Sequence, residues 1–190
     1  EQVNIAVVGS GYVGLVTGIC LAQLGHRVVC VDNDKAKVAS LKKNKLPIYE
    51  PELDQLLVRN VRLKRLSFSH SIKDATRQSE VVFIAVGTPS KENGEADLTY
   101  VENVAREIAE NMDSYKLIVE KSTVPTATGK RIQRTVQMNL PKKFNGGKKG
   151  ALEFDVASNP EFLREGSAVY DFMHPDRIFI GVESKKAEEL

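Results

Sequence analysis

Gly9, Gly11 and Gly14 form a G-x-G-x-x-G pattern directly after an apolar run that ends at Val8. A small, apolar stretch with helical character follows the pattern. In this setting the first glycine permits a tight turn, the second lets the backbone approach a pyrophosphate, and the third lets the helix pack close to the strand. The free N–H groups at the helix N-terminus favour phosphate. We therefore expect a dinucleotide at this loop.

Asp32 stands at the end of the next apolar run. A carboxylate there accepts hydrogen bonds from both ribose hydroxyls and repels the 2′-phosphate of NADP, so NAD is the expected cofactor. Lys37, one helical turn further, is placed to contact the adenosine side. The structural alternatives are that the glycines only form a turn, that Asp32 only caps a helix, and that Lys37 is a solvated lysine on a helix face.

Apolar runs and helical patterns alternate along the chain. Expected strands span 3–8, 27–31, 67–69, 81–86, 117–120, 154–157 and 178–182, and expected helices span 12–24, 34–43, 51–58, 98–112 and 126–138, with the start of another at 185–190. Continuously apolar strands indicate a sheet buried on both faces. The alternation predicts an α/β fold in one domain over 1–190: a doubly wound, mainly parallel Rossmann-type sheet with helices on both faces.

Three of the expected strands are followed by unusual loops, at 86–90, 120–125 and 158–166. Each loop on its own is an ordinary turn rich in Gly, Pro, Ser and Thr. Because the carboxyl ends of parallel strands meet at one edge of the sheet, the loops together are expected to surround a single crevice.

Composition narrows the class of protein. The 190 residues carry a formal net charge of +2, which argues against a dedicated nucleic-acid binder. The segment 141–150, which contains four lysines, is interpreted as an exposed loop and is the best candidate insertion. Cys20 and Cys30 fall in apolar segments and are expected to be buried thiols, which suits a cytoplasmic protein. The longest apolar runs are too short to span a membrane, and neither a signal peptide nor a metal is expected.

The loops and the glycine pattern together resemble the UDP-glucose/GDP-mannose dehydrogenase family, N-terminal NAD-binding domain. The resemblance covers essentially the whole chain. It is carried, in order, by Gly9-Ser-Gly-Tyr-Val-Gly14, Leu46-Pro-Ile-Tyr-Glu-Pro51, Val86-Gly-Thr-Pro89, Lys121-Ser-Thr-Val-Pro125 and Asn159-Pro-Glu-Phe-Leu-Arg-Glu165.

The resemblance implies a complete enzyme that oxidises the C6 alcohol of a nucleotide sugar to a carboxylate with two NAD⁺ and one water, through a cysteine-linked intermediate. Segments 166–168 and 174–178 look more like the UDP-glucose branch, so UDP-glucose is the expected substrate and UDP-glucuronate the product. The alternatives are a GDP-mannose or UDP-N-acetylhexosamine substrate and a non-catalytic NAD-binding module. An NADP-linked β-hydroxyacid dehydrogenase is disfavoured by Asp32 and by segment 159–165.

The resemblance also implies roles for particular residues. Glu161 matches the general base for hydrolysis of the intermediate, and Thr123 matches a hydroxyl that orients the water. The substrate segment corresponds to Glu161, Phe162, Leu163, Arg164 and Glu165. The NAD contacts correspond to Gly9, Gly11, Tyr12, Val13, Gly14, Asp32, Lys37, Val86, Gly87, Thr88, Pro89, Ser122, Thr123 and Glu165.

The family's nucleophilic cysteine belongs to a C-terminal half that also supplies a lysine, an asparagine and a long helix that builds the dimer. Segments of that kind are missing from this sequence, and Cys20 and Cys30 lie in the wrong elements to replace the nucleophile. We therefore expect a fragment of a longer enzyme that forms a homodimer or a larger homo-oligomer. The fragment alone is expected to bind NAD without turning over UDP-glucose.

Overall fold

A six-stranded parallel sheet forms the centre of the protein, with strand order β3-β2-β1-β4-β5-β8. The computed structural model describes residues 2–121, 128–141, 143–145, 148–150 and 152–190. The central strands are β1 (Asn4–Val8), β2 (Arg27–Val31), β3 (Leu66–Ser69), β4 (Val81–Ile84), β5 (Lys116–Glu120) and β8 (Phe154–Ser158). This order is that of doubly wound dinucleotide-binding sheets, so the predicted fold class is confirmed. The winding direction reverses between β1 and β4, and the loops after these strands therefore border a crevice.

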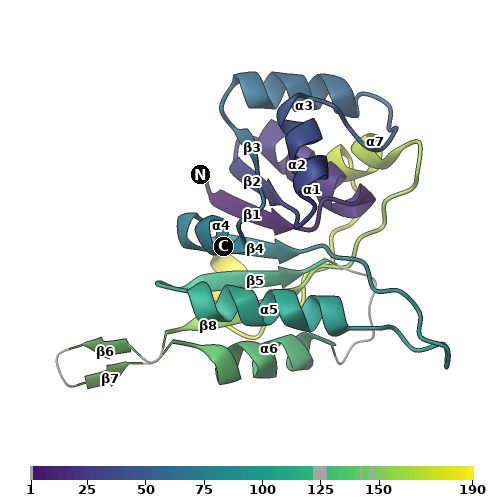
Figure 1. Ribbon diagram of the computed structural model, residues 1–190. Coiled ribbons are helices and arrows are strands. Elements are labelled where there is room, and N and C mark those ends of the chain that lie inside the picture. Colours follow the sequence, from purple (N-terminus) through teal and green to yellow (C-terminus); the bar gives the residue numbers. More distant parts are fainter. Residues whose placement is uncertain (1, 122–127, 142, 146–147, 151) are drawn as a thin grey trace.

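Helices cover both faces of the sheet, as Figure 1 shows. One face carries α1 (Tyr12–Gln23), α2 (Lys35–Lys42), α3 (Leu53–Arg62), α7 (Ala168–Met173) and α8 (Lys185–Glu189). The other face carries α4 (Ile72–Gln78), α5 (Thr99–Asn111) and α6 (Thr128–Asn139). The side chains of each strand point to the two faces in turn, so Ile5 and Val7 join one core cluster while Ala6 and Val8 join the other.

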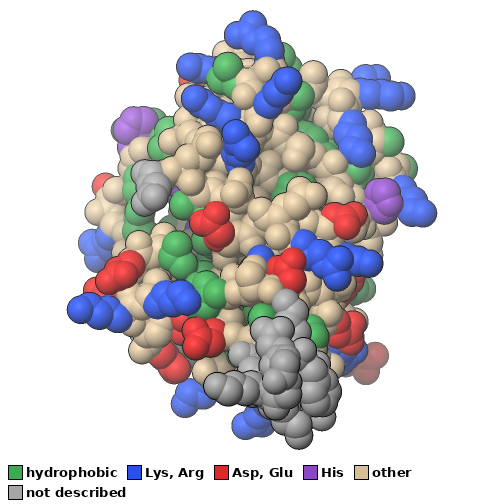
Figure 2. Space-filling view, turned by 90° about the vertical axis from the view of Figure 1, so that its left-hand side faces the viewer, with side chains coloured by type: hydrophobic (Ala, Val, Ile, Leu, Met, Phe, Trp, Pro, Cys, Tyr) green, Lys and Arg blue, Asp and Glu red, His purple; other side chains and the backbone are tan. Residues whose placement is uncertain are grey.

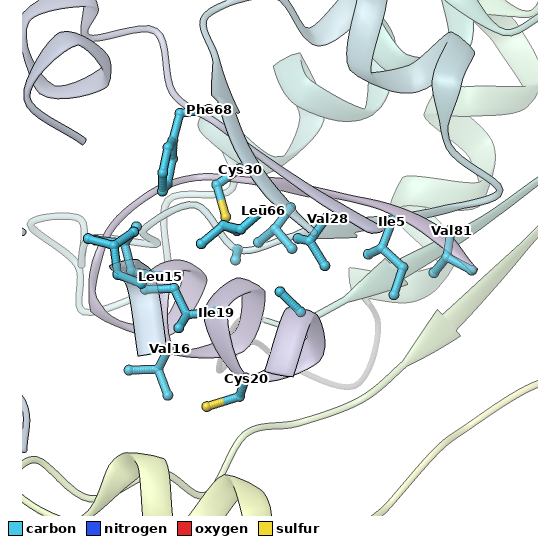
Figure 3. Packing of buried hydrophobic residues seen from close by; sticks show 14 of the residues in the cluster. Ile5, Leu15, Val16, Ile19, Cys20, Val28, Cys30, Leu66, Phe68 and Val81 are labelled. Atoms are coloured by element: carbon cyan, nitrogen blue, oxygen red, sulfur yellow. The ribbon is translucent and has the colours of Figure 1, made fainter. Parts of the chain in front are cut away.

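Helix α1 lies in the middle of its layer, between the sheet and the helices α3 and α7. This position explains why its sequence is apolar on all sides, since Leu15, Val16 and Ile19 are all fully buried. Figure 3 shows Leu15 and Ile19 packed beneath Val28 and Cys30, which extend from strand β2 toward the helix, whereas Val16 lies on the far side of the helix. The helix that follows the glycine loop is thus fixed by packing along its whole length.

Cys20 and Cys30 are free and buried, which confirms the prediction for both thiols. In Figure 3 the sulfur of Cys30 points from the sheet toward α1, whereas that of Cys20 lies on the far side of this helix. Burial raises the pKa of both thiols to about 12, and the charge of Glu50 adds to the effect at Cys20. Both thiols therefore stay protonated at neutral pH.

Four regions differ from the sequence prediction. Helices α4 and α7 are short elements that the sequence patterns did not reveal. The expected strand at 178–182 is wrong, because only Gly181 forms a bridge, antiparallel to Ser158. The expected loop at 141–150 contains a separate two-stranded antiparallel sheet of β6 (Lys143–Asn145) and β7 (Lys148–Gly150).

The surface carries charges of both signs. Figure 2 shows Lys and Arg side chains gathered at the top of the molecule, the end at which α3 lies in Figure 1. The end of α3 and the turn after it supply Arg59, Arg62 and Lys64, which are exposed. Among the helices of the described residues, none is long and apolar enough to cross a membrane.

Candidate functional site

The glycine loop joins β1 to α1, and two of its positions accept only glycine. Gly9 has φ = +106°, and a Cβ atom there would lie 2.5 Å from the carbonyl oxygen of Ala85. A Cβ atom on Gly14 would lie 1.7 Å from the carbonyl oxygen of Gly9. Gly9 thus makes the turn possible and Gly14 brings the helix against the strand end, as the spacing predicted.

Gly11 serves a different purpose, because space surrounds it. A Cβ atom built on Gly11 would meet no described atom within 4 Å. Gly11 is also the N-cap residue of α1, and among the described side chains none donates to or accepts from this helix end as a cap. The first-turn N–H groups of α1 therefore remain available to a bound anion. Open space beside free N–H groups is what the pyrophosphate of a dinucleotide requires.

Asp32 follows β2 and binds the glycine loop directly. Its Oδ2 atom accepts from the backbone N of Ser10 at 3.1 Å and from Ser10 Oγ at 2.6 Å. Lys37 Nζ donates to the same oxygen at 3.0 Å. The N-cap of α2 is Asp34, whose side chain accepts from Ala36 N and Lys37 N, so Asp32 is not the cap of that helix. Lys37 is likewise not simply a solvated lysine, because its ammonium group forms an ion pair with Asp32.

The environment of Asp32 keeps its carboxyl group ionised. Burial acts to raise its pKa, but hydrogen bonds from Ser10, Asp34 and Lys37 outweigh burial and lower the pKa to about 2. The Oδ1 atom accepts from Asp34 N at 2.9 Å. A charged acceptor thus stands at the carboxyl end of β2, next to the phosphate loop, where a ribose would lie.

A cavity of about 600 Å³ opens between these loops, within the range typical of small-molecule sites. Of the predicted NAD contacts, Gly9, Gly11, Asp32, Lys37, Val86, Gly87 and Pro89 line it. Tyr12, Val13, Gly14, Thr88 and Glu165 are not among its lining residues. The cavity is therefore lined by the glycine loop, by Asp32 and by the loop after β4.

The cavity is also lined by residues that the sequence patterns did not identify. Tyr100, Asn103 and Glu107 come from one face of α5, at helical spacing, and His70 follows directly after β3. The sequence could have indicated His70, because this residue directly follows an expected strand, and ligands bind at the carboxyl ends of such strands. The α5 residues could be found only after the helix had been placed against the sheet.

The candidate substrate segment lies beyond β8, next to a buried lysine. Lys121, only 7% exposed, donates from Nζ to Asn159 Oδ1 at 2.9 Å. Burial lowers the pKa of Lys121, and the negative charge of Glu161 opposes that shift. The Glu161 Oε2 atom accepts from the backbone N of Leu163 at 2.7 Å. Glu161 is therefore held in its own turn, within the electrostatic reach of an ammonium group.

Arg164 and Phe162 of the same segment are exposed, but each contacts another side chain. Arg164 donates from Nη2 and Nε to the carboxylate of Asp171 at 2.7 and 3.1 Å, a bidentate pair. The Arg164 guanidinium, together with Ser167, lowers the pKa of Asp171 to about 2. The Phe162 ring meets that of Phe179 edge to face, with centroids 5.8 Å apart. Ser122 and Thr123 lie outside the described residues.

Glu50 is the residue near the site that sequence reasoning missed most clearly. It belongs to the segment expected to be a loop between the second and third helices, yet it is only 3% exposed. Its carboxylate accepts from Tyr12 Oη, from Gly166 N at 2.9 Å and from Ala168 N at 2.8 Å. An acid between two prolines gives no sequence signal for burial. Its partners lie far away in the chain, so folding alone reveals it.

Comparisons with known proteins agree with this geometry. The family model described as UDP-glucose/GDP-mannose dehydrogenase family, NAD binding domain, matches residues 3–190. The chain is 52% identical to UDP-glucose 6-dehydrogenase TuaD of Bacillus subtilis, over 98% of this chain and 39% of the relative. It is 50% identical to the UDP-glucose 6-dehydrogenase of Rhizobium meliloti, over 95% of this chain and 39% of the relative.

Solved structures give the same result. A UDP-glucose dehydrogenase from Pyrobaculum islandicum matches with a TM-score of 0.90 and 41% identity, over 100% of this chain and 43% of that one. A GDP-mannose dehydrogenase from Pseudomonas aeruginosa matches with a TM-score of 0.88 and 37% identity, over 98% of this chain and 42% of that one. The chain thus spans about two fifths of the length of these relatives. It belongs to the UDP-glucose/GDP-mannose dehydrogenase family, as the NAD-binding domain of that family.

Proposed function

We propose that this chain is the N-terminal, NAD⁺-binding part, residues 1–190, of a UDP-glucose 6-dehydrogenase. The complete enzyme oxidises UDP-glucose to UDP-glucuronate with two NAD⁺ and one water, through an intermediate on a cysteine that lies in another part of the polypeptide. The observation that carries the proposal is the ionised Asp32 bound to Ser10 at the edge of a cavity that Gly11 leaves open. The 52% identity to a UDP-glucose 6-dehydrogenase supports the choice of sugar.

The residues of this chain position the cofactor. The first-turn N–H groups of α1 take the pyrophosphate, the Asp32 carboxylate takes the adenosine ribose hydroxyls, and Lys37 holds Asp32 in place. When bound, NAD⁺ supplies the hydride acceptor of both oxidation steps. Its nicotinamide is placed by the loops around Val86 to Pro89, Ser122 and Thr123, with Glu165 nearby. Tyr12, Val13 and Gly14 supply the N–H groups of this first turn, and Thr88 belongs to the loop after β4, so all four remain proposed NAD⁺ contacts although they are not among the lining residues of the cavity.

Glu161 acts as the general base of the hydrolysis step. As an ionised carboxylate it takes a proton from the attacking water, and Thr123 orients that water. Release from the Leu163 N–H would free the Glu161 Oε2 atom for this step. Phe162, Leu163, Arg164 and Glu165 complete the nucleotide-sugar contacts.

The resemblance and the free, buried thiols lead us to propose two further properties of the complete enzyme. It forms a homodimer or a larger homo-oligomer, with UDP-glucose as its small-molecule partner. It works in the cytoplasm, where the reducing conditions suit Cys20 and Cys30.

Two measurements on the 190-residue chain test whether it binds NAD⁺ and whether it lacks dehydrogenase activity without the rest of the enzyme. Calorimetry should show NAD⁺ binding, with NADP bound more weakly because Asp32 repels its 2′-phosphate. Incubation with NAD⁺ and UDP-glucose should give no sustained rise in NADH absorbance, whereas the complete polypeptide should give one. Sustained turnover by the chain alone, or a preference for NADP, would contradict the proposal. A thermal-shift panel of UDP-glucose, GDP-mannose and UDP-N-acetylhexosamines on the complete polypeptide tests the sugar.

Gly11→Ala gives a matched test of the phosphate site. The new methyl group meets no described atom within 4 Å, so the thermal midpoint should fall only by the small cost of alanine at this N-cap, while NAD⁺ affinity falls by about tenfold or more. Gly25→Ala, a change at another turn glycine that is open but has φ = +109°, controls for strain away from the site and should leave affinity unchanged. Undiminished NAD⁺ affinity in Gly11→Ala would place the pyrophosphate elsewhere.

A further inference from the structure

Glu50 is a buried acid to which the proposed chemistry gives no role. In the segment before α3, burial alternates, so that Leu46, Ile48 and Glu50 are turned inward while Pro47 and Tyr49 are exposed. Leu46 and Ile48 pack against the core cluster around α1, and this packing draws Glu50 in with them. An ionised carboxylate without water is costly unless hydrogen bonds replace the water. The groups that bond it therefore indicate what it does.

The partners of Glu50 come from the two halves of the candidate site. Tyr12 is the first residue of α1, directly after the glycine loop, and its hydroxyl donates to Glu50 Oε2. Gly166 N donates to the same oxygen at 2.9 Å, and Ala168 N donates to Oε1 at 2.8 Å. Gly166 and Ala168 follow the candidate substrate segment 161–165. One side chain thus bridges the turn that faces the pyrophosphate and the turn that follows the sugar-binding segment.

A helix cap would explain only part of this arrangement. The N-cap residue of α7, Ser167, makes no side-chain cap bond, so Glu50 takes over the capping of this helix through Ala168 N. A cap of α7 has no need of a bond to Tyr12. Helices α1 and α7 lie side by side in Figure 1, and Glu50 fastens their N-terminal ends to each other. The bond to Tyr12 connects the cap to the cofactor loop.

We propose that Glu50 is a positioning residue that couples the glycine loop to the turn 166–168, so that a pyrophosphate bound at α1 orders the segment that takes up the nucleotide sugar. Binding at the first turn of α1 restrains Tyr12, Tyr12 restrains the carboxylate, and the carboxylate restrains the amides of Gly166 and Ala168. Coupling of this kind appears as a change in local opening, which amide hydrogen exchange measures. The inference rests on the proposed NAD⁺ site.

Tyr12→Phe separates coupling from capping. The substitution removes the hydroxyl and leaves the bonds from Gly166 and Ala168 to Glu50 intact. In the unsubstituted chain, saturating NAD⁺ should slow exchange at the Gly166 and Ala168 amides by about tenfold. In Tyr12→Phe, saturated with NAD⁺ at a higher concentration, this slowing should be lost, while exchange without NAD⁺ stays within about twofold of the unsubstituted value.

Two further variants complete the design. Glu50→Gln keeps the shape but loses the charge, and it should speed exchange at both amides with and without NAD⁺. Glu52→Gln changes an exposed acid of the same segment and should behave as the unsubstituted chain. If NAD⁺ slows exchange in Tyr12→Phe as much as in the unsubstituted chain, Glu50 is only a cap and the coupling is overturned. If the unsubstituted chain fails to bind NAD⁺, the proposed function itself falls, which calorimetry on that chain alone reveals.

Discussion

At the scale of single residues, Asp32 shows how much one carboxylate can organise. Its hydrogen bonds reach Ser10 in the glycine loop, Asp34 at the start of α2 and Lys37 one turn into that helix. The sequence pointed to this acid from its place after β2, because a dinucleotide site is expected to carry a carboxylate there for the ribose. It could not predict the bonds to Ser10, since they depend on how the loop folds back over the strand end.

Asp32 should make the stability of the domain depend on acid pH. Its pKa falls from an ordinary 3.8 to about 2 on folding, so its stabilising contribution is complete above pH 4 and is lost as the pH falls toward 2. Asp32→Asn cannot carry the charge, and its free energy of unfolding at pH 7 should be lower by about 1–2 kcal/mol. The difference between the two proteins should then shrink on acidification.

Urea unfolding at several pH values between 7 and 2 measures this difference. Asp54→Asn, at an exposed acid in the first turn of α3, is the matched control and should follow the unsubstituted protein closely. Asp171 and Glu50 also have a lowered pKa and contribute to the acid response of every variant, so only the difference isolates Asp32. A gap that stays constant down to pH 2 would mean that the charge of Asp32 does not stabilise the fold.

At the scale of elements, the sequence patterns were reliable where burial was continuous. Strands β1, β2, β4 and β5 were placed to within two residues at each end because each is a largely apolar run in the centre of the sheet. Strand β3 was also placed to within one residue, although only Leu66 and Phe68 of its four residues are buried. Helix α4 was missed because it has only seven residues and too little periodicity, although Ser71 caps it by accepting from Asp74 N. The apolar run at 178–182 suggested a strand, but the chain returns antiparallel to β8 and pairs only at Gly181. Whether the run at 178–182 pairs with β8 depends on the path of the chain between the two, which local sequence patterns do not predict.

The contact between α1 and β2 depends on a glycine that the phosphate-loop pattern does not include. A Cβ atom on Gly18 would lie 2.4 Å from Cys30 Sγ, and both residues are buried. Gly18→Ala gains helix propensity, but overpacking against the sheet should outweigh that gain and lower the free energy of unfolding by about 1–2 kcal/mol. Cys30→Ala alone should cost about 1 kcal/mol through the cavity that it leaves.

The double variant Gly18→Ala/Cys30→Ala should restore much of the loss, because the new methyl group fills the space left by the sulfur. Its free energy of unfolding should exceed the additive expectation by at least about 1 kcal/mol, as a double-mutant cycle in urea would measure. Val7→Ala/Cys30→Ala is a control pair without an added methyl group. Strict additivity in the Gly18 cycle would show that the helix shifts away from the sheet.

At the scale of the whole molecule, apolar side chains remain exposed on the segments after β8. Phe162, Ile178, Phe179 and Ile180 are 62, 65, 50 and 62% exposed, whereas the central strands are covered on both faces. Neighbouring exposed apolar side chains favour association between molecules. The sequence patterns could not foresee this exposure, because the same apolar residues would have been buried if 178–182 had joined the sheet.

Ile180→Ser tests whether the segment 178–182 contributes to the stability of the domain core. Because Ile180 is 62% exposed, the free energy of unfolding should change by less than about 0.5 kcal/mol. Ile84→Ser, at a fully buried position of β4, is the matched control and should cost at least about 3 kcal/mol. Sedimentation velocity at rising concentration should show less self-association for Ile180→Ser than for the unsubstituted chain, since the substitution shrinks the exposed apolar surface. A loss of stability at Ile180 comparable to that at Ile84 would show instead that the segment 178–182 packs as part of the domain core.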